Sequence, residues 1–105
     1  MEKKDDIIGE FTLFYEKWKI IETDVIRNKK LIYGETDWME NTIKIKRGLS
    51  KDIKRLTLYH ELFHIIFSNG SYKECCNDEP LVEWSAKCLD ELNKCGIISI
   101  FDYDK

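Results

Sequence analysis

The pentapeptide His60-Glu61-Leu62-Phe63-His64 constrains this chain more than any other stretch of it. It is an H-E-x-x-H pattern. Residues four apart share one face of a helix, so both imidazoles can bind one ion. Glu61 points to another side of the helix, which leaves its carboxylate free to hold a water at that ion. The chain contains no other histidine. The pattern therefore predicts a zinc site rather than two unrelated histidines in a core or on a surface.

A helix is indicated on both sides of this motif. Ser50 is a good N-cap, and Asp52 places a negative charge in the first turn, where the helix dipole favours it. Gly70 predicts the end of the helix, in a left-handed cap. The residues that follow helical spacing are Ile53, Leu56, His60, Phe63, His64 and Phe67. Since the two histidines lie on this apolar stripe, we expect them to point toward the core.

The chain before the motif favours strands. Residues 7–24 are rich in β-formers and predict a hairpin of two short strands joined near residues 15–17. A helical stripe through the same apolar residues stays open as an alternative, but Gly9 would be costly inside a helix. Residues 42–46 alternate, with Ile43 and Ile45 on one face, and predict a half-buried strand.

Between these strands, the residues Leu31 to Tyr33 form a short apolar run that Gly34 is expected to break. After the motif, residues 71–78 are expected to be a polar loop. A second helix is predicted to begin near Glu79 and Pro80, because proline suits the first helical position. Its expected core stripe is Val82, Ala86, Leu89 and Leu92, and Gly96 is expected to end it.

This order of elements predicts one α+β domain over residues 1–105, with a small N-terminal antiparallel or mixed sheet packed on the motif helix and on a second, C-terminal helix. Residues 97–103 can add a last strand or simply pack onto this domain. The four cysteines are expected to be free thiols, and Cys88 and Cys95 are expected to share a buried helix face. The other two are Cys75 and Cys76.

Charge and hydropathy argue against two classes of partner, nucleic acids and membranes. The net charge of −3 gives no basic surface for nucleic acid. No apolar run approaches the roughly 20 residues that span a bilayer. The first residues lack the apolar core and cleavage site of a secretory signal. We therefore expect a cytoplasmic protein that engages neither nucleic acid nor membrane. The H-E-x-x-H motif, rather than the charge, predicts a protein or peptide as its partner, and the oligomeric state stays open.

A catalytic zinc commonly has three protein ligands, so a third must join the two histidines. A motif with a third histidine would need Gly at position 67 and His at position 70, where this chain has Phe67 and Gly70. A carboxylate is therefore expected, ahead of a cysteine. The candidates are Glu74, Asp78, Glu79, Glu83 and Asp90.

Helical geometry ranks two of these candidates. Glu79 and Glu83 are four apart on the second helix, so both can lean toward one neighbour. At about 100° per residue, Glu79 falls at the edge of the apolar stripe and Glu83 falls nearer the polar side with Asp90. Glu79 is thus predicted as the third ligand, and Glu83 as a carboxylate beside it that orients a metal-bound histidine through the other ring nitrogen. If Glu79 lies before the first full turn, because Pro80 follows it, these two roles swap.

Four segments together resemble the short phage and mobile-element members of the ImmA/IrrE metallopeptidase family. They are YGETDW, TIKIKRGLS, TLYHELFHIIF and DEPLVEWSAKCL, within about residues 31–95. The resemblance implies a minimal zincin with His60 and His64 as zinc ligands, Glu61 as base, and Glu79 or Glu83 as the third ligand. It also implies that residues 42–47 form the edge strand nearest the active-site groove, to which an extended substrate adds itself as a strand.

The motif and the resemblance together predict a zinc-dependent metallopeptidase. Zn²⁺ would lower the pKa of its bound water to roughly 7, and Glu61 would take the proton of that water and pass it to the leaving amine. The resemblance implies a repressor-type transcription factor as substrate. The alternative is a non-enzymatic, zinc-bearing module of phage or mobile-element origin that binds a protein. An intact Glu61 favours the enzyme, because a binding module does not need it.

Overall fold

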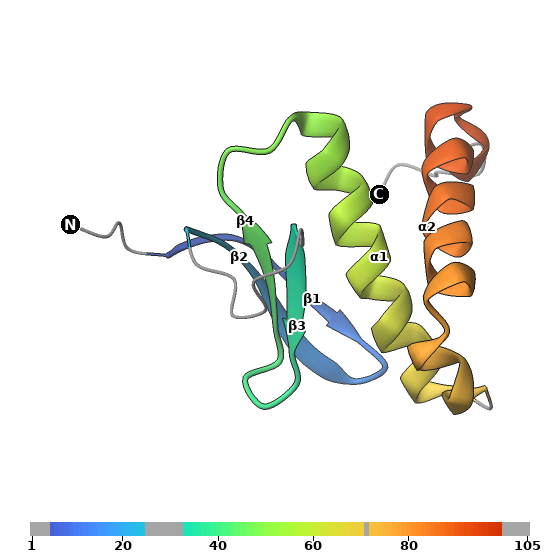
Figure 1. Ribbon diagram of the computed structural model, residues 1–105, viewed down its shortest axis with the longest axis horizontal. Helices are drawn as coiled ribbons and strands as arrows, with labels where there is room; N and C mark the ends of the chain where they lie inside the picture. The colour runs from blue at the N-terminus through green and yellow to red at the C-terminus, as the bar shows by residue number, and fades with distance from the viewer. Residues whose placement is uncertain (1–4, 25–32, 71, 100–105) are drawn as a thin grey trace.

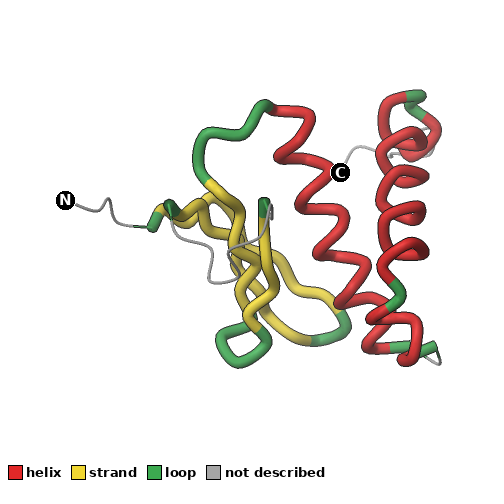
Figure 2. Tube along the Cα trace, viewed as in Figure 1, coloured by secondary structure: helices red, strands yellow, loops and turns green. Residues whose placement is uncertain are grey.

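The computed structural model describes residues 5–24, 33–70 and 72–99. A four-stranded mixed sheet lies on one side of helix α1, and helix α2 lies on the other side (Figure 1; Figure 2). The predicted α+β class is therefore confirmed. The elements are β1 (Asp6–Leu13), β2 (Glu16–Thr23), β3 (Gly34–Asp37), β4 (Thr42–Lys46), α1 (Lys51–Asn69), the 3₁₀ turn η1 (Lys73–Asn77), α2 (Glu79–Lys94) and the 3₁₀ turn η2 (Ile97–Ser99).

Strands β1 and β2 form the predicted hairpin, so the helical alternative for residues 7–24 is wrong. Leu13 pairs with Glu16, and the two residues between them, Phe14 and Tyr15, both have positive φ. Two positive φ values in a two-residue loop match the right-handed twist of the flanking strands. The pairing register shifts between Ile7 and Gly9, which is where a glycine inside a strand often marks a bulge.

The sheet order is β1-β2-β4-β3, so the expected edge position of residues 42–47 is wrong. Strand β4 pairs in parallel with β2 and antiparallel with β3, which places it inside the sheet. Its strand character was predicted correctly, because Ile43 and Ile45 are fully buried on the α1 face. The alternating pattern reports burial of one face, and it carries no information about which neighbours a strand has.

The edge strand near α1 is β3. It begins at Gly34, the glycine that was expected to break the apolar run from Leu31 to Tyr33. A Cβ on Gly34 would lie 2.6 Å from Thr57 Cγ2 and 2.9 Å from the Lys44 carbonyl oxygen. Only glycine therefore lets β3 approach both α1 and β4 this closely. Leu31 and Ile32, from the apolar run before it, lie outside the described residues.

Helix α1 is covered on two sides, and its deepest row differs from the predicted stripe. Thr57, Glu61 and Ile65 are the buried residues, and Ile65 joins the sheet core of Trp18, Ile43 and Ile45. The histidines are half-buried and face α2 and η1 instead. A helix between two layers needs two contact faces, which one apolar stripe cannot indicate.

Both helices begin as predicted. Ser50 Oγ accepts the Ile53 N–H at the start of α1, and Asp78 Oδ1 accepts the Leu81 N–H at the start of α2. Gly70, however, is extended (φ −105°, ψ −170°), so the left-handed cap is wrong. In the predicted polar loop after α1, residues 73–77 form η1.

Helix α2 buries Val82 and Ala86 as expected, but Leu92 is exposed and Leu89 is only half-buried. Asp90 is the third buried residue of α2, although it was placed on the polar side. Its carboxylate is neutralised by Arg55, which allows burial. The cysteines described are free, and Cys95 is exposed while Cys88 is half-buried, so the buried face expected for these two is wrong. Residues 97–99 form η2; the rest of the expected last element lies outside the described part.

Candidate metal centre

Helix α2 runs antiparallel to α1 and brings Glu79 to both histidines of the motif. Glu79 Oε1 lies 3.1 Å from His60 Nε2, and Glu79 Oε2 lies 3.4 Å from His64 Nε2. One ligand atom from each of the three residues lies within 4.8 Å of the others. The structure thus brings together the three residues predicted as ligands.

The ring of His64 is oriented by the backbone of η1. Its Nδ1 lies 2.6 Å from the Cys76 carbonyl oxygen. A carbonyl can only accept, so Nδ1 carries the proton and Nε2 presents its lone pair toward Glu79. A carbonyl that fixes the tautomer from the far side of the ring is a usual support for a metal-binding histidine.

The thiol of Cys76 bonds the backbone of His64. Cys76 Sγ donates to the His64 carbonyl oxygen at 3.2 Å. Burial, and then the negative charge of Glu79, raise the pKa of this thiol, which keeps it protonated. Of the two hydrogen bonds between η1 and His64, one therefore holds the imidazole ring and the other holds its backbone carbonyl.

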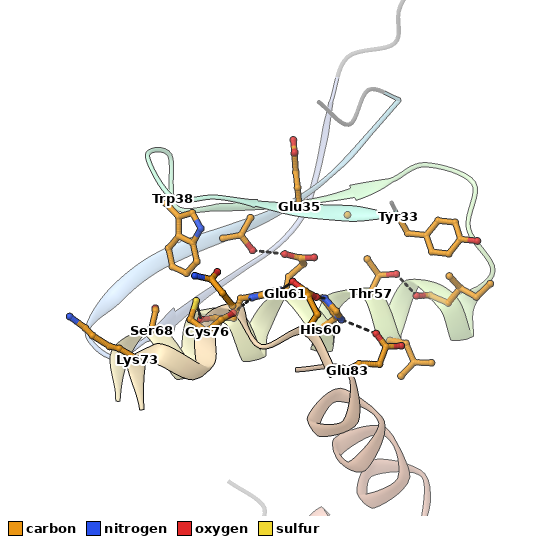
Figure 3. Close-up of a pocket in the computed structure, with 17 residues that line it drawn as sticks. Tyr33, Glu35, Trp38, Thr57, His60, Glu61, Ser68, Lys73, Cys76 and Glu83 are labelled. Carbon is orange, nitrogen blue, oxygen red and sulfur yellow. Dashed lines mark hydrogen bonds and ion pairs between the residues drawn. The ribbon is translucent and has the colours of Figure 1, made fainter. Parts of the chain in front are cut away.

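The ring of His60 is supported by Glu83. Glu83 Oε1 lies 3.4 Å from His60 Nδ1, on the side of the ring opposite Glu79. Figure 3 shows His60 and Glu83 facing each other at the lower side of the site. The two carboxylates thus differ in their contacts: Glu79 lies against both histidines, and Glu83 lies against Nδ1 of His60.

Glu61 is held from the sheet side of α1. Its carboxylate is buried, and Oε1 accepts a hydrogen bond from Thr36 Oγ1 at 2.7 Å (Figure 3). Sequence reasoning missed Thr36, because 25 residues separate it from Glu61 and no local spacing signals the contact. Gly34 is an indirect signal, since the missing side chain lets β3 come close to α1.

The donor set fits a zinc ion. Two imidazole nitrogens and one carboxylate are the ligands that hydrolytic zinc sites use, with one position left for water. Both rings have a partner at Nδ1, so both offer Nε2 to the same point. The carboxylates of Glu79 and Glu83 are 64% and 56% exposed, so solvent and a substrate can reach this point.

A groove of about 1060 Å³ contains the site. Strand β3 and its neighbours form one wall, and the helices and η1 form the floor and the other wall (Figure 3). Its lining includes Glu61 and both histidines, together with Tyr33, Gly34, Glu35, Thr36, Trp38, Ile53, Leu56, Thr57, Ser68, Lys73, Cys76, Asn77, Glu79 and Glu83. The site therefore lies in a cleft that extends past it in both directions.

The position of Glu79 depends on how α2 docks on α1. Asp90 Oδ1 lies 2.6 Å from Arg55 Nε, and Asp90 Oδ2 lies 3.1 Å from Lys94 Nζ. The hydrogen bond from Arg55, and more weakly that from Lys94, lower the pKa of Asp90 against the effect of burial. This ion pair lies three helical turns from Glu79 and, with Val82 and Ala86, fixes the register of the two helices.

The remaining candidates for a third ligand have other roles or no contact with the site. Asp90 pairs with Arg55, and Asp78 caps α2. Glu74 is exposed on η1 and does not line the groove.

Comparison with known proteins adds no relative: no family model, curated protein or solved structure matches this chain. Among the described residues, no helix has the length and apolar character that crossing a bilayer requires.

Proposed function

We propose that this chain is a zinc-dependent endopeptidase that cleaves a cytoplasmic regulatory protein, of the repressor type that the resemblance implies. The observation that carries the proposal is the meeting of His60, His64 and Glu79 beside a buried, hydrogen-bonded Glu61. Two imidazoles and a carboxylate form a zinc-binding set, and a separate carboxylate beside them forms a base.

In this proposal His60, His64 and Glu79 hold the ion, while Glu83 and the Cys76 carbonyl orient the two rings. Zinc supplies Lewis acidity at the attacked carbonyl and makes water acidic enough to react near neutral pH. The protein supplies a fixed donor set and a cleft that a peptide can enter.

Glu61 moves the proton. Thr36 occupies one oxygen of its carboxylate, which leaves Oε2 to accept a proton from the attacking water. The same carboxyl then donates that proton to the amine that leaves when the C–N bond breaks. Burial between α1 and β3 keeps this carboxylate in one orientation throughout, which a solvent-exposed glutamate would not provide.

Strand β3 supports binding of an extended peptide. Lys46 N donates to the Tyr33 carbonyl at 2.7 Å, and the pairs alternate along β3 and β4 from there. The N–H and C=O groups of Gly34 and Thr36 therefore point away from β4, toward the free edge. A substrate strand can pair with these groups directly above the site.

Metal analysis followed by digestion tests the proposal. Protein purified without a metal-affinity step is expected to contain about one zinc per chain. Incubation with candidate repressors is expected to give discrete fragments, and Glu61→Gln is expected to keep zinc and lower the rate by about 10²- to 10⁴-fold. A wild type that binds its target and leaves it whole, with Glu61→Gln behaving identically, would favour the non-enzymatic binding module.

A further inference from the structure

The two ends of the groove differ in chemistry. At one end, Tyr33 and Ile53 are exposed and Leu56 is half-buried, and all three line the groove. At the other end, the lining is Trp38, Ser68, Lys73, Cys76 and Asn77. Figure 3 shows Tyr33 and Trp38 at opposite ends of β3, with Glu61 and His60 between them. Exposed apolar side chains that gather in a cleft indicate a binding surface.

The length of the groove matches a short extended peptide. Its lining along α1 runs from Ile53 to Ser68, which is about 22 Å at 1.5 Å per residue. An extended chain covers this distance with about six or seven residues. The site lies near the middle, so a bound peptide would extend about three residues to either side of the bond that is cut.

The apolar end lies about 11 Å along α1 from the midpoint of the two histidines, measured to the midpoint of Ile53 and Leu56. That distance is about three extended residues. Directly opposite residues of paired strands project to the same face of a sheet. A substrate residue paired with Gly34 therefore projects to the α1 side of the sheet.

Charge at this end disfavours an acidic occupant. Because α2 runs antiparallel to α1, Glu83 lies nearer the apolar end than Glu79 does. Its carboxylate is more than half exposed and borders the groove there. Lys73 lies at the opposite end, so an acidic substrate side chain would be attracted away from Tyr33 and Ile53.

From these observations we infer a specificity subsite formed by Tyr33, Ile53 and Leu56, which takes one large uncharged apolar side chain of the substrate, about three residues from the scissile bond. The inference rests on the proposed peptidase function for its placement relative to the cut. The substrate class is therefore an extended segment with an aliphatic or aromatic residue at this position, cut internally.

A randomised octapeptide library tests the subsite. The zinc-loaded wild type is incubated with the library, and cleavage sites are read by mass spectrometry. Leucine, isoleucine, methionine and phenylalanine are expected to exceed aspartate about tenfold or more at one position about three residues from the cut. Ile53→Ser is expected to remove most of this preference. Leu92→Ser, an exposed leucine on α2 outside the groove, is the matched control and is expected to retain it.

A binding arm separates the subsite from the peptidase activity. The same library is captured on immobilised Glu61→Gln protein, and the bound peptides are sequenced. If the wild type cuts nothing but the captured peptides are enriched in apolar residues, and Ile53→Ser loses that enrichment, the subsite stands and the peptidase proposal fails. The subsite is overturned if neither cleaved nor captured peptides show an apolar preference, or if Ile53→Ser protein, with wild-type melting temperature, retains it.

Discussion

Charged side chains join α1 to α2 at two places, and the two places differ in what they leave unsatisfied. At one, Arg55 meets Asp90, whose side chain is 6% exposed and also contacts Lys94. At the other, His60 and His64 meet Glu79 and Glu83, which are largely exposed. The first place holds a carboxylate between two permanent cations. The second holds two carboxylates and two imidazoles, which carry no permanent charge.

This difference separates a structural contact from a binding site. A buried carboxylate with a guanidinium partner has its charge and its hydrogen bonds satisfied, so it has no further ligand to attract. Two carboxylates that converge on imidazole nitrogens leave negative charge and lone pairs facing solvent. A divalent cation neutralises that charge and uses those lone pairs. The comparison therefore predicts that substitutions at the two places have different consequences.

The largest expected effect is on zinc binding at the histidine end. Structural zinc sites bind with about 10–16 kcal/mol over four ligands, so each ligand contributes about 2.5–4 kcal/mol. His64→Ala is therefore expected to weaken zinc by roughly several hundred-fold, measured by competition with a chromogenic chelator. Asp90→Asn is the matched substitution at the other place. Its effect on zinc is expected to stay below about tenfold, because Val82 and Ala86 still hold α2 against α1. Equal losses in both variants would remove the distinction.

The next effect distinguishes the two carboxylates that meet the histidines, Glu79 and Glu83. Glu79→Ala is expected to weaken zinc about as much as His64→Ala does, because Glu79 reaches both histidines. Glu83→Ala is expected to cost about 10- to 100-fold, the usual range for a residue that orients a ligand. A larger loss for Glu83→Ala would exchange the two roles. Glu83→Gln serves as the control, because an amide oxygen can still accept from His60 Nδ1 and most of the affinity should return.

A third effect concerns the sheet side of the same helix. Thr36→Val removes the donor to Glu61 while preserving the shape of the side chain. Hydrogen bonds to charged groups contribute about 1.5–3 kcal/mol, so kcat is expected to fall about 10- to 100-fold. Zinc content and KM should change little, because Thr36 contacts neither histidine. Thr36→Ser is expected to restore most of kcat. If Thr36→Ser is as slow as Thr36→Val, the role of Thr36 is one of packing.

The sequence predicted the site better than the strand that borders it. The spacing of His60 and His64, and the angular position of Glu79, are local properties of single helices, so they could be read directly. That α2 folds back onto α1 to bring these residues together was an assumption about tertiary structure, and the structure supports it. The identity of these residues as zinc ligands stays a prediction.

Strand order and burial depend on long-range contacts, which local patterns do not contain. The pattern of β4 indicated a strand but not its interior position, and Gly34 was taken as a breaker because its partner Thr57 is distant in sequence. Asp90 was assigned to the polar side because a helical wheel does not include Arg55 on the neighbouring helix. In each case a residue from another element decides the outcome.

The smallest expected effect is the pH dependence of stability that Asp90 provides. It tests the ion pair with Arg55 separately from the histidines. Arg55 lowers the pKa of Asp90 in the folded state below its ordinary value of 3.8. The folded protein therefore binds this proton less readily than the unfolded chain does. The stabilisation is fully present above the ordinary aspartate pKa, near pH 4, and is lost as the pH falls through the lower folded value.

We expect the difference in unfolding free energy between wild type and Asp90→Asn, measured by urea denaturation with a chelator present, to be constant from pH 7 to about pH 5 and to shrink below about pH 4. Asp52→Asn is the control, since Asp52 contacts the same arginine from an exposed position and should show a much smaller difference. A gap between wild type and Asp90→Asn that does not change with pH would mean that shape and hydrogen bonding, rather than charge, hold α2 in place at this end, and the contrast between the two places would then rest on the histidine end alone.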